Sequence, residues 1–263
     1  MRLRFARLGR VVAIEGRPIA EVMALVEPLS PRDNSSNLKA YAPIYLRTSE
    51  LLAGLGVLKE AGPATFTVAD KEGVERDVVI EPVEPEDDIA WHGGAPLTLP
   101  VGEPLWLQDR DSVIWWEFLP DSGTLYVQYN EMEGGINDIV DEILTRAKQD
   151  DVERVVVDLR KNGGGDNGTY RTFLHGLEDP AIDRPGRLIL LIGRLTFSAA
   201  ANFATELDQT TGAWFAGEDM GGSPNLYGDT RRTDLPTSGQ VVYIAKVYWQ
   251  KSTPDDPRIT IEP

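Results

Sequence analysis

A continuous apolar run without alternation opens the most informative stretch of the chain, residues 187–202. Its length suits one strand that is buried on both faces. Gly193 ends this strand, and the alanine-rich segment after Ser198 favours a helix. The pattern therefore predicts a strand, a turn and a helix, with Ser198 at or just before the helix N-terminus.

The rest of the second half alternates between strand and helix patterns. Residues 137–149 have the spacing of an amphipathic helix capped by Asn137, and residues 170–177 are a second expected helix. Further strands are expected at residues 112–119, 124–129, 155–159, 213–216, 240–245 and 258–261. This alternation is typical of an α/β layer structure with largely parallel strands.

The first half predicts a smaller α+β module, residues 1–82. Its expected elements are a strand, two helices and a closing hairpin, at residues 10–15, 19–29, 48–58, 64–69 and 77–81. The stretch 83–104 is rich in proline and acidic residues and contains His92. We interpret it as a linker to a second domain, residues 105–263.

Composition narrows the function classes. The 263 residues are 41% hydrophobic and 26% charged, as in ordinary globular proteins. A net charge of −16 argues against nucleic acid or an anionic membrane surface as the main partner. The absence of cysteine excludes disulfides, thiolate nucleophiles and cysteine-based zinc sites. With two histidines and no close ligand cluster, no metal or cofactor is expected.

No targeting or membrane segment is expected in this sequence. Its apolar runs are far shorter than the roughly 20 residues needed to cross a bilayer. The charged N-terminus has no apolar core behind it, unlike a signal peptide. The pattern predicts a soluble chain and leaves its compartment open.

Ser198 has two interpretations. At a helix N-terminus a serine hydroxyl commonly caps unpaired amides. The same position suits a nucleophile, because the next amide can help to bind an oxyanion. The local sequence leaves both open.

Two glycine-rich loops accompany this serine. The three glycines at 163–165 follow a buried strand and can form either an anion-binding nest of amides or a flexible turn. Asp158, at the end of that strand, is expected to pin the loop through hydrogen bonds. The later loop, 217–229, is too rich in glycine for a regular element and is expected to line a binding site. A nucleophile, amide donors and a groove are what an acyl-transfer site needs.

At these three segments the chain resembles the S41 peptidases, the family of the C-terminal processing (tail-specific) proteases and the tricorn core protease. Residues 158–165, 196–200 and 217–222 look like the family's first glycine loop, nucleophile segment and second glycine loop. The resemblance covers about residues 112–263. More weakly, residues 9–82 resemble the PDZ-like region that precedes this core. The resemblance implies an α/β fold with a crotonase-like ββα core and a PDZ-like α+β module.

The resemblance also implies residue roles. Ser198 takes the family's nucleophile position, and the amide of Ala199 is one oxyanion donor. The second donor would come from the glycine loop, from Gly163, Gly164 or Gly165. The second loop would line the substrate groove through Gly221, Gly222, Asn225 and Tyr227.

The chain departs from the family at the proton acceptor. Processing proteases use a lysine in the second glycine loop, where this chain has Ser223. Tricorn-like relatives use a histidine from an upstream segment, which we expect to be missing here. The family's usual Glu four residues after the serine is Asn202. Lys251 is a candidate base, whereas His92 and His175 are expected to lie away from the serine.

The leading hypothesis is a serine-type peptidase that hydrolyses a peptide or protein substrate through an acyl-enzyme on Ser198. The missing base is expected to make hydrolysis by this chain weak or absent. The alternative is a non-catalytic relative that binds peptide or an apolar ligand. An acyl-CoA enzyme would also bind an oxyanion with backbone amides, but no basic residues are placed to hold the CoA phosphates.

Overall fold

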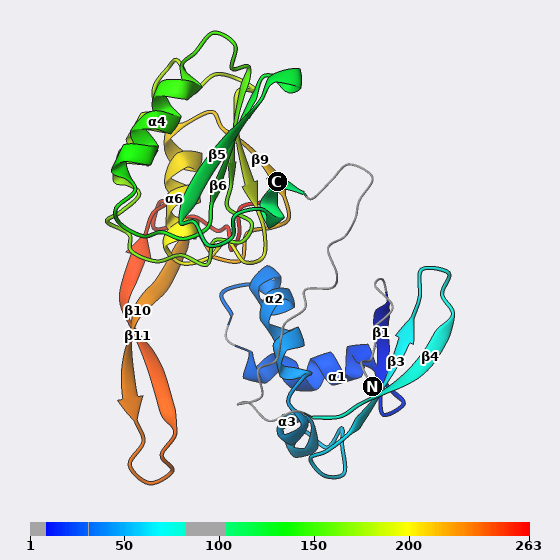
Figure 1. Cartoon of the computed structure of the whole chain (residues 1–263). Coiled ribbons are helices and arrows are strands. Elements are labelled where there is room, and N and C mark those ends of the chain that lie inside the picture. Colours follow the sequence, from blue (N-terminus) through cyan, green and yellow to red (C-terminus); the bar gives the residue numbers. More distant parts are fainter. Residues whose placement is uncertain (1–8, 31, 83–103) are drawn as a thin grey trace. The chain divides into compact units, whose positions relative to one another are not determined.

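The computed structural model of the chain describes residues 9–30, 32–82 and 104–263. The chain divides into two compact units, coloured along the sequence in Figure 1. The first unit is Met1–Pro31 with Tyr41–Pro104, and the second is Arg32–Ala40 with Leu105–Pro263. Apart from its last residue, the expected linker lies outside the described residues, as does His92 within it.

A four-stranded antiparallel sheet in the order β2-β1-β3-β4 frames the first unit. Its strands are β1 (Arg10–Ile14), β2 (Arg17–Pro18), β3 (Ala64–Ala69) and β4 (Glu75–Ile80). The helices that accompany them are α1 (Ile19–Val26), η1 (Glu27–Leu29) and α3 (Ser49–Gly54). The hairpin expected at residues 64–81 is confirmed as β3 and β4. Ile14, Val22 and Leu52 join the helices and the sheet in a small apolar core.

Helix α2 (Ser35–Tyr45) is absent from the sequence expectations. The residues of this helix up to Ala40 belong to the second unit. Asn34 Nδ2 donates to the carbonyl of Met220 at 3.0 Å, and Ser36 Oγ donates to the carbonyl of Asp219 at 2.6 Å. These bonds fix the start of α2 on the second unit.

A five-stranded sheet in the order β5-β6-β7-β8-β9 frames the second unit. Its strands are β5 (Ile114–Leu119), β6 (Thr124–Tyr129), β7 (Arg154–Asp158), β8 (Leu188–Ile192) and β9 (Trp214–Gly217). Two short 3₁₀ turns, η2 (Leu105–Leu107) and η3 (Pro120–Ser122), flank β5. β5 is antiparallel to β6, and β6 to β9 run parallel. The predicted, largely parallel sheet is therefore confirmed.

Three helices lie beside this sheet, and α4 and α6 are labelled in Figure 1. They are α4 (Asn137–Ala147), α5 (Arg171–Leu177) and α6 (Ala199–Thr210). α5 contacts both of the others. Helices and sheet enclose one core, whose fully buried large aromatic residues are Tyr129, Tyr170, Phe173 and Phe203. Within the described ranges, no helix has the length and apolar character to cross a membrane.

Three expectations for the second unit are wrong. The N-cap of α4 is Ile136 rather than Asn137, and no side chain caps that helix. Residues 258–261 form no strand. Residues 217–229 are not irregular throughout, because β10 (Asn225–Asp234) starts within them. β10 pairs with β11 (Val241–Gln250) in a long hairpin that projects from the sheet (Figure 1).

Candidate active site

Ser198 lies in the tight connection between β8 and α6, directly before Ala199. Its backbone has φ 51° and ψ −125°, and its side chain makes no capping hydrogen bond. Such a conformation costs about 1–3 kcal/mol in a residue other than glycine. Ser198 thus occupies the N-cap position without capping the helix, and the interpretation of its hydroxyl as a cap is wrong.

Buried polar contacts hold the turn before Ser198 against the loop after β7. The hydroxyl of Thr196 donates to the carbonyl of Leu159 at 2.8 Å and accepts the amide of Gly193 at 3.0 Å. The amide of Phe197 donates to the carbonyl of Asn162 at 3.2 Å. These bonds join two loops at the carboxyl ends of neighbouring parallel strands, where ligands commonly bind in such sheets.

Gly164 lies directly against Ser198. Its φ is 110°, and a Cβ added there would lie 2.6 Å from Ser198 Cβ and 2.9 Å from the amide nitrogen of Ala199. Glycine alone tolerates both that backbone angle and that approach. The loop is shaped by Asn162, whose side-chain oxygen accepts the amide of Gly164 at 2.9 Å. Its side-chain nitrogen donates to the carbonyl of Tyr129 at 2.9 Å.

Amides beside Ser198 are candidate oxyanion donors. Within the part of the chain that the structure describes, the amides of Ala199, Gly163 and Gly165 donate to no protein group. The amide of Gly164 is already held by the Asn162 side chain. The N-terminal dipole of α6 favours negative charge at the same place. Gly164 therefore lets the loop approach Ser198 closely, and the free amides are those of Gly163, Gly165 and Ala199.

Asp158 ends β7 and is fully buried. It accepts the hydroxyl of Tyr126 at 2.8 Å, and it accepts the backbone amide and the guanidinium of Arg160 at 3.0 and 2.6 Å. Burial raises the pKa of Tyr126, and the charge of Asp158 raises it further. Asp158 therefore holds Arg160 at the start of the loop, whereas the amide of Gly164 is held by Asn162, so the expected pinning reaches only the first part of the loop.

The second glycine loop packs against the turn that carries Ser198. The amides of Gly221 and Gly222 donate to the carbonyls of Gly193 and Thr196 at 3.2 and 3.0 Å. A Cβ on Gly222 would lie 2.5 Å from the Cβ of Ala201. These two glycines therefore support the turn through their backbone.

Asn225 and Tyr227, which were also expected in the groove, belong to β10. The side-chain oxygen of Asn225 accepts the amides of Lys251 and Ser252 at 2.9 and 3.0 Å, which fixes the chain after β11. Tyr227 is 68% exposed, and its ring lies 4.9 Å from that of Tyr248. The structure gives both residues a place in the hairpin.

A cavity of about 380 Å³ opens between the first glycine loop and the base of the hairpin. Its lining residues are Gly165, Asp166, Asn167, Gly168, Asp229 and Trp249. Asn167 accepts a hydrogen bond at 2.6 Å from Asn202, which is fully buried in α6. The cavity therefore adjoins a glycine with a free amide and is bounded by a loop tied to the serine helix.

No proton acceptor accompanies Ser198 among the described residues, since none of them forms a hydrogen bond with its hydroxyl. His175 is exposed on α5, with Nδ1 3.1 Å from Glu178 Oε2. Lys251 Nζ lies 2.5 Å from Glu206 Oε1, so its ammonium forms an ion pair with that carboxylate. The geometry gives Lys251 no contact with Ser198. No cluster of three or more metal-ligating side chains occurs in the described ranges.

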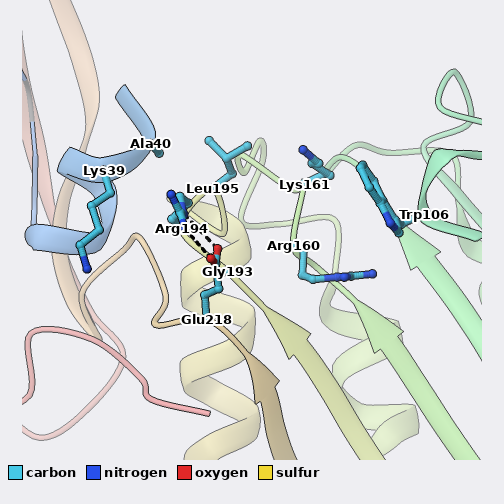
Figure 2. Close-up of a pocket in the computed structure, with 9 residues that line it drawn as sticks. All are labelled: Lys39, Ala40, Trp106, Arg160, Lys161, Gly193, Arg194, Leu195 and Glu218. Carbon is cyan, nitrogen blue, oxygen red and sulfur yellow. Dashed lines mark hydrogen bonds and ion pairs between the residues drawn. The ribbon is translucent and has the colours of Figure 1, made fainter. Parts of the chain in front are cut away.

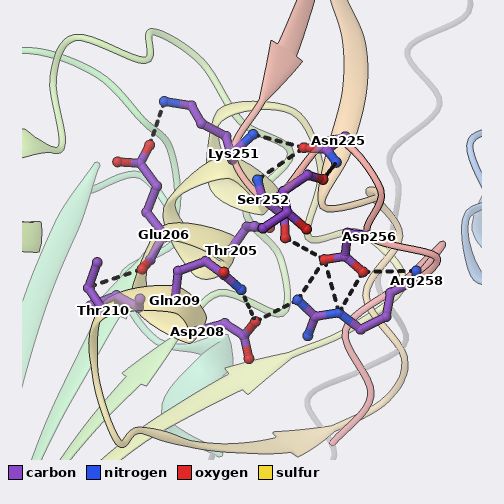
Figure 3. A network of polar contacts seen from close by, with 12 residues as sticks. Thr205, Glu206, Asp208, Gln209, Thr210, Asn225, Lys251, Ser252, Asp256 and Arg258 are labelled. Atoms are coloured by element: carbon purple, nitrogen blue, oxygen red, sulfur yellow. Dashed lines mark hydrogen bonds and ion pairs between the residues drawn. The ribbon is translucent and has the colours of Figure 1, made fainter.

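Figure 3 shows Glu206 within a polar network on α6. Its carboxylate accepts the hydroxyl of Tyr170 at 2.7 Å as well as Lys251. Burial raises the pKa of Glu206, but hydrogen bonds from Lys251 and Tyr170 outweigh burial and hold it below the ordinary value. Further along α6, Asp208 pairs with Arg258 at 2.8 Å. The helix is thereby tied to the chain that follows β11.

Comparisons with known proteins find similarity in structure and none in sequence. No protein-family model matches the sequence, and no curated protein matches it. A mutant of CPAF matches with a TM-score of 0.61 and 11% identity over 100% of this chain and 73% of its own. Mature CPAF complexed with lactacystin matches with a TM-score of 0.54 and 12% identity, over 97% of this chain and 72% of its own. The photosystem II D1 C-terminal processing protease matches with a TM-score of 0.42 and 13% sequence identity, over 96% of this chain and 61% of its own.

The chain is similar in fold to CPAF. At these identities the comparisons show the fold alone, and the mixed α/β structure with several sheets agrees with the fold class expected from the sequence. At 11 to 13% identity the comparisons carry no residue roles. Those roles have to be argued from the site itself.

Sequence reasoning missed two residues that build the site, Thr196 and Asn162. Both are fully buried polar side chains that join separate loops. Asn162 had a usable signal, because asparagine commonly hydrogen-bonds the backbone two residues on. The bond to Gly164 is of that kind. Thr196 had no such signal, since its acceptor lies in the loop of another strand.

Proposed function

We propose that this protein is a serine-type peptidase of S41 type that cleaves peptide bonds through an acyl-enzyme on Ser198. The observation that carries the proposal is the backbone of Ser198, with φ 51° and no capping bond from its hydroxyl. A strained, uncapped serine beside free amides fits a nucleophile better than it fits a structural turn. As part of this proposal, the second unit has a crotonase-like ββα core and the first is PDZ-like.

In the proposed reaction, Ser198 Oγ attacks the carbonyl carbon of the scissile peptide. The carbonyl oxygen becomes an oxyanion, held by the amide of Ala199 and by that of Gly163 or Gly165. When the carbon–nitrogen bond breaks, the amine leaves with the proton that the hydroxyl gave up. Water then attacks the ester and releases the acid. Removal of one oxyanion donor typically lowers kcat by about 10²–10³.

The proton transfer sets the expected rate. A serine hydroxyl without a base is a poor nucleophile at neutral pH. No described residue accepts a hydrogen bond from Ser198. We therefore expect weak peptide hydrolysis from this chain, with a rate that rises toward alkaline pH. The same observation favours the second candidate function, a relative that binds peptide without cleaving it.

The test compares the parent protein with Ser198→Ala on unstructured peptides and with a fluorophosphonate probe. We expect one probe adduct on Ser198 by intact mass and peptide mapping, and none in the variant. Ser223→Ala is a matched control, because Ser223 lies in the second glycine loop and its hydroxyl donates to the carbonyl of Ile259. Equal hydrolysis by parent and Ser198→Ala, with no adduct on Ser198, would remove the catalytic proposal.

A further inference from the structure

The β10–β11 hairpin forms a sheet of its own in the part of the chain that the structure describes, so each of its strands keeps one unpaired edge. Its base joins the core through Leu226 and Trp249. The rest projects from the five-stranded sheet (Figure 1), and no described helix or other strand makes extensive contact with it. A two-stranded ribbon in water is marginally stable at best. The hairpin therefore lacks a partner.

β11 has the sequence pattern of a strand that is covered on both faces. Eight of its ten residues are apolar or aromatic, and Lys246 is its one charged residue. Continuous patterns of this kind belong to strands buried on both sides. In the structure none of the ten residues is buried, and residues 241–244 are exposed one after another. On a water-facing surface such a run is unfavourable unless it serves a contact.

The two edges of the hairpin differ. Four of the last six residues of β10 are charged, and one of them, Asp229, has a φ of 48° that departs from strand geometry. Charges and irregular backbone are the devices by which proteins keep an edge strand from pairing. β11 has a single charge and no residue with a positive φ. The edge open to pairing is therefore that of β11.

Both faces of β11 carry apolar groups beside this edge. Side chains alternate along a strand, so Val242, Ile244 and Tyr248 lie on one face. Val241 and Tyr243 lie on the other. All five side chains are between 38% and 63% exposed. A strand added along β11, with side chains of its own on both faces, would cover both groups.

The charge of the hairpin differs from that of the whole chain. The chain has a net charge of −16, so two copies repel each other over most of their surface. Residues 225–250 carry three positive and two negative side chains, a net charge of +1. The hairpin is therefore a part of the surface where two acidic copies approach each other without this repulsion.

Another positive region is a cavity of about 390 Å³ lined by Lys39, Lys161 and Arg194 among others. In Figure 2 the ammonium of Lys39 points away from Lys161, with Arg194 and Leu195 between them. Arg194 is paired with Glu218, with Nε 2.9 Å from the carboxylate. These charges do not converge on one ligand, whereas the hairpin offers one continuous surface.

A second copy of the chain is the occupant that matches these features. Every copy carries the same ten-residue edge, and two such edges pair antiparallel about a two-fold axis, which is the commonest symmetry of protein dimers. A peptide substrate would cover β11 only while bound. A second copy covers it throughout, as the marginal stability of a lone ribbon requires.

We propose that the chain forms a two-fold dimer in which β11 pairs with the β11 strand of a second copy. The product is a four-stranded antiparallel sheet with the charged β10 strands at its outer edges. Covering the five apolar side chains and the strand edge in both copies buries roughly 1,000 Å² in total, near the lower limit of specific interfaces. We therefore expect a dissociation constant in the micromolar range. The proposal does not depend on the peptidase function.

Sedimentation velocity at increasing protein concentration tests the dimer, with the full chain and the edge variant Tyr243→Glu/Ile244→Glu. On β10, Arg232 lies opposite Tyr243 and Arg231 lies opposite Ile244. The new carboxylates therefore gain cross-strand partners within the hairpin, which keeps its pairing. In the dimer they replace apolar contacts on both faces and bring like charges together.

The matched control is Thr230→Glu/Thr233→Glu, which adds the same charge to β10. We expect the parent to become dimeric as concentration rises. The edge variant should raise the dissociation constant at least about tenfold, because apolar burial is lost, and the control should change it little. A parent that stays monomeric at every concentration, or equal weakening by the control, would overturn the proposal.

Single thiols give a second measurement that does not require a destabilising change, because the chain has no cysteine. Ala245→Cys places a thiol midway along β11, on strands that are neighbours in the dimer and about 5 Å apart. Thr230→Cys places it opposite, on the β10 strands, which are three strand spacings or about 14 Å apart. We expect a short bis-maleimide to join two copies through Ala245→Cys far faster than through Thr230→Cys. Equal rates, or pairing of β11 only with an added peptide, would refute the dimer.

Discussion

Replacement of Gly164 by alanine is the sharpest perturbation of the serine site. The added Cβ would lie 2.6 Å from Ser198 Cβ, and 2.9 Å from both the amide nitrogen of Ala199 and the carbonyl oxygen of Phe197. Two of these three atoms belong to the backbone, so no rotamer change relieves the overlap. The φ of 110° adds strain for any residue with a side chain.

The expected loss of stability is the sum of the steric overlap and the backbone strain. Overpacking of a well-packed site costs about 1–3 kcal/mol, and an unfavourable φ adds roughly 1 kcal/mol. We therefore expect Gly164→Ala to lower the free energy of unfolding of the second unit by about 2–4 kcal/mol. Domains are usually stable by about 5–15 kcal/mol, so the variant should still fold. A displacement of Ser198 by about 1 Å should slow its reactions about 100-fold.

The assay pairs fluorophosphonate labelling rates with urea unfolding. Gly163→Ala is the control, because a Cβ at that neighbouring glycine meets nothing within 4 Å. We expect the control to match the parent in both measurements. If Gly164→Ala is labelled on Ser198 at the parent rate and unfolds at the urea concentration of the control, the glycine loop does not position the serine.

Three further predictions concern the surroundings of Ser198. Asn162→Ala should lower the free energy of unfolding by about 2–3 kcal/mol in urea titrations, because it leaves a buried carbonyl of Tyr129 and an amide unpaired. The pKa of Glu206 lies below its ordinary 4.5 in the folded state, so its contribution to stability is present above that pH and lost as pH falls through the lowered pKa. Thermal unfolding of Glu206→Gln between pH 3 and about 7 should accordingly show a weaker acid dependence than the parent. Ser198→Gly should be about 1 kcal/mol more stable than Ser198→Ala in urea, because glycine relieves the strained φ. Equal stability of these two variants would contradict the strain at Ser198.

Strands with strong apolar patterns were predictable from the sequence. β7 and β8 lie within a residue of the expected bounds, because continuous apolar runs suit strands inside a parallel sheet. The expected burial of both faces holds only in part. Alternate residues of β8 are fully buried, and those between them, Ile189 and Leu191, are half-buried. One face of this strand meets the core, and the other is partly covered.

Elements fixed by distant contacts were not predictable. α2 contains Pro43 and follows a loop-like stretch, so its local pattern is weak. Its start is set by Asn34, which caps Asn37 at 2.9 Å and also reaches Met220. Residues 258–261 read as a strand, but Thr260 Oγ1 donates to the carbonyl of Met220 at 2.8 Å, outside any ladder. In both cases the deciding partner lies far away in the sequence.

The serine site shows why a pattern can place a residue and still miss its role. The sequence located Ser198 at a helix N-terminus, where the commonest use of a serine is to cap. The structure gives it a positive φ and no cap bond. Glycine would fit such a turn without strain, and a capping serine would have the extended backbone of an ordinary N-cap. Because the turn gains nothing from this hydroxyl, the strain argues that the hydroxyl itself is what the position requires, as expected where local rules fail at a functional site.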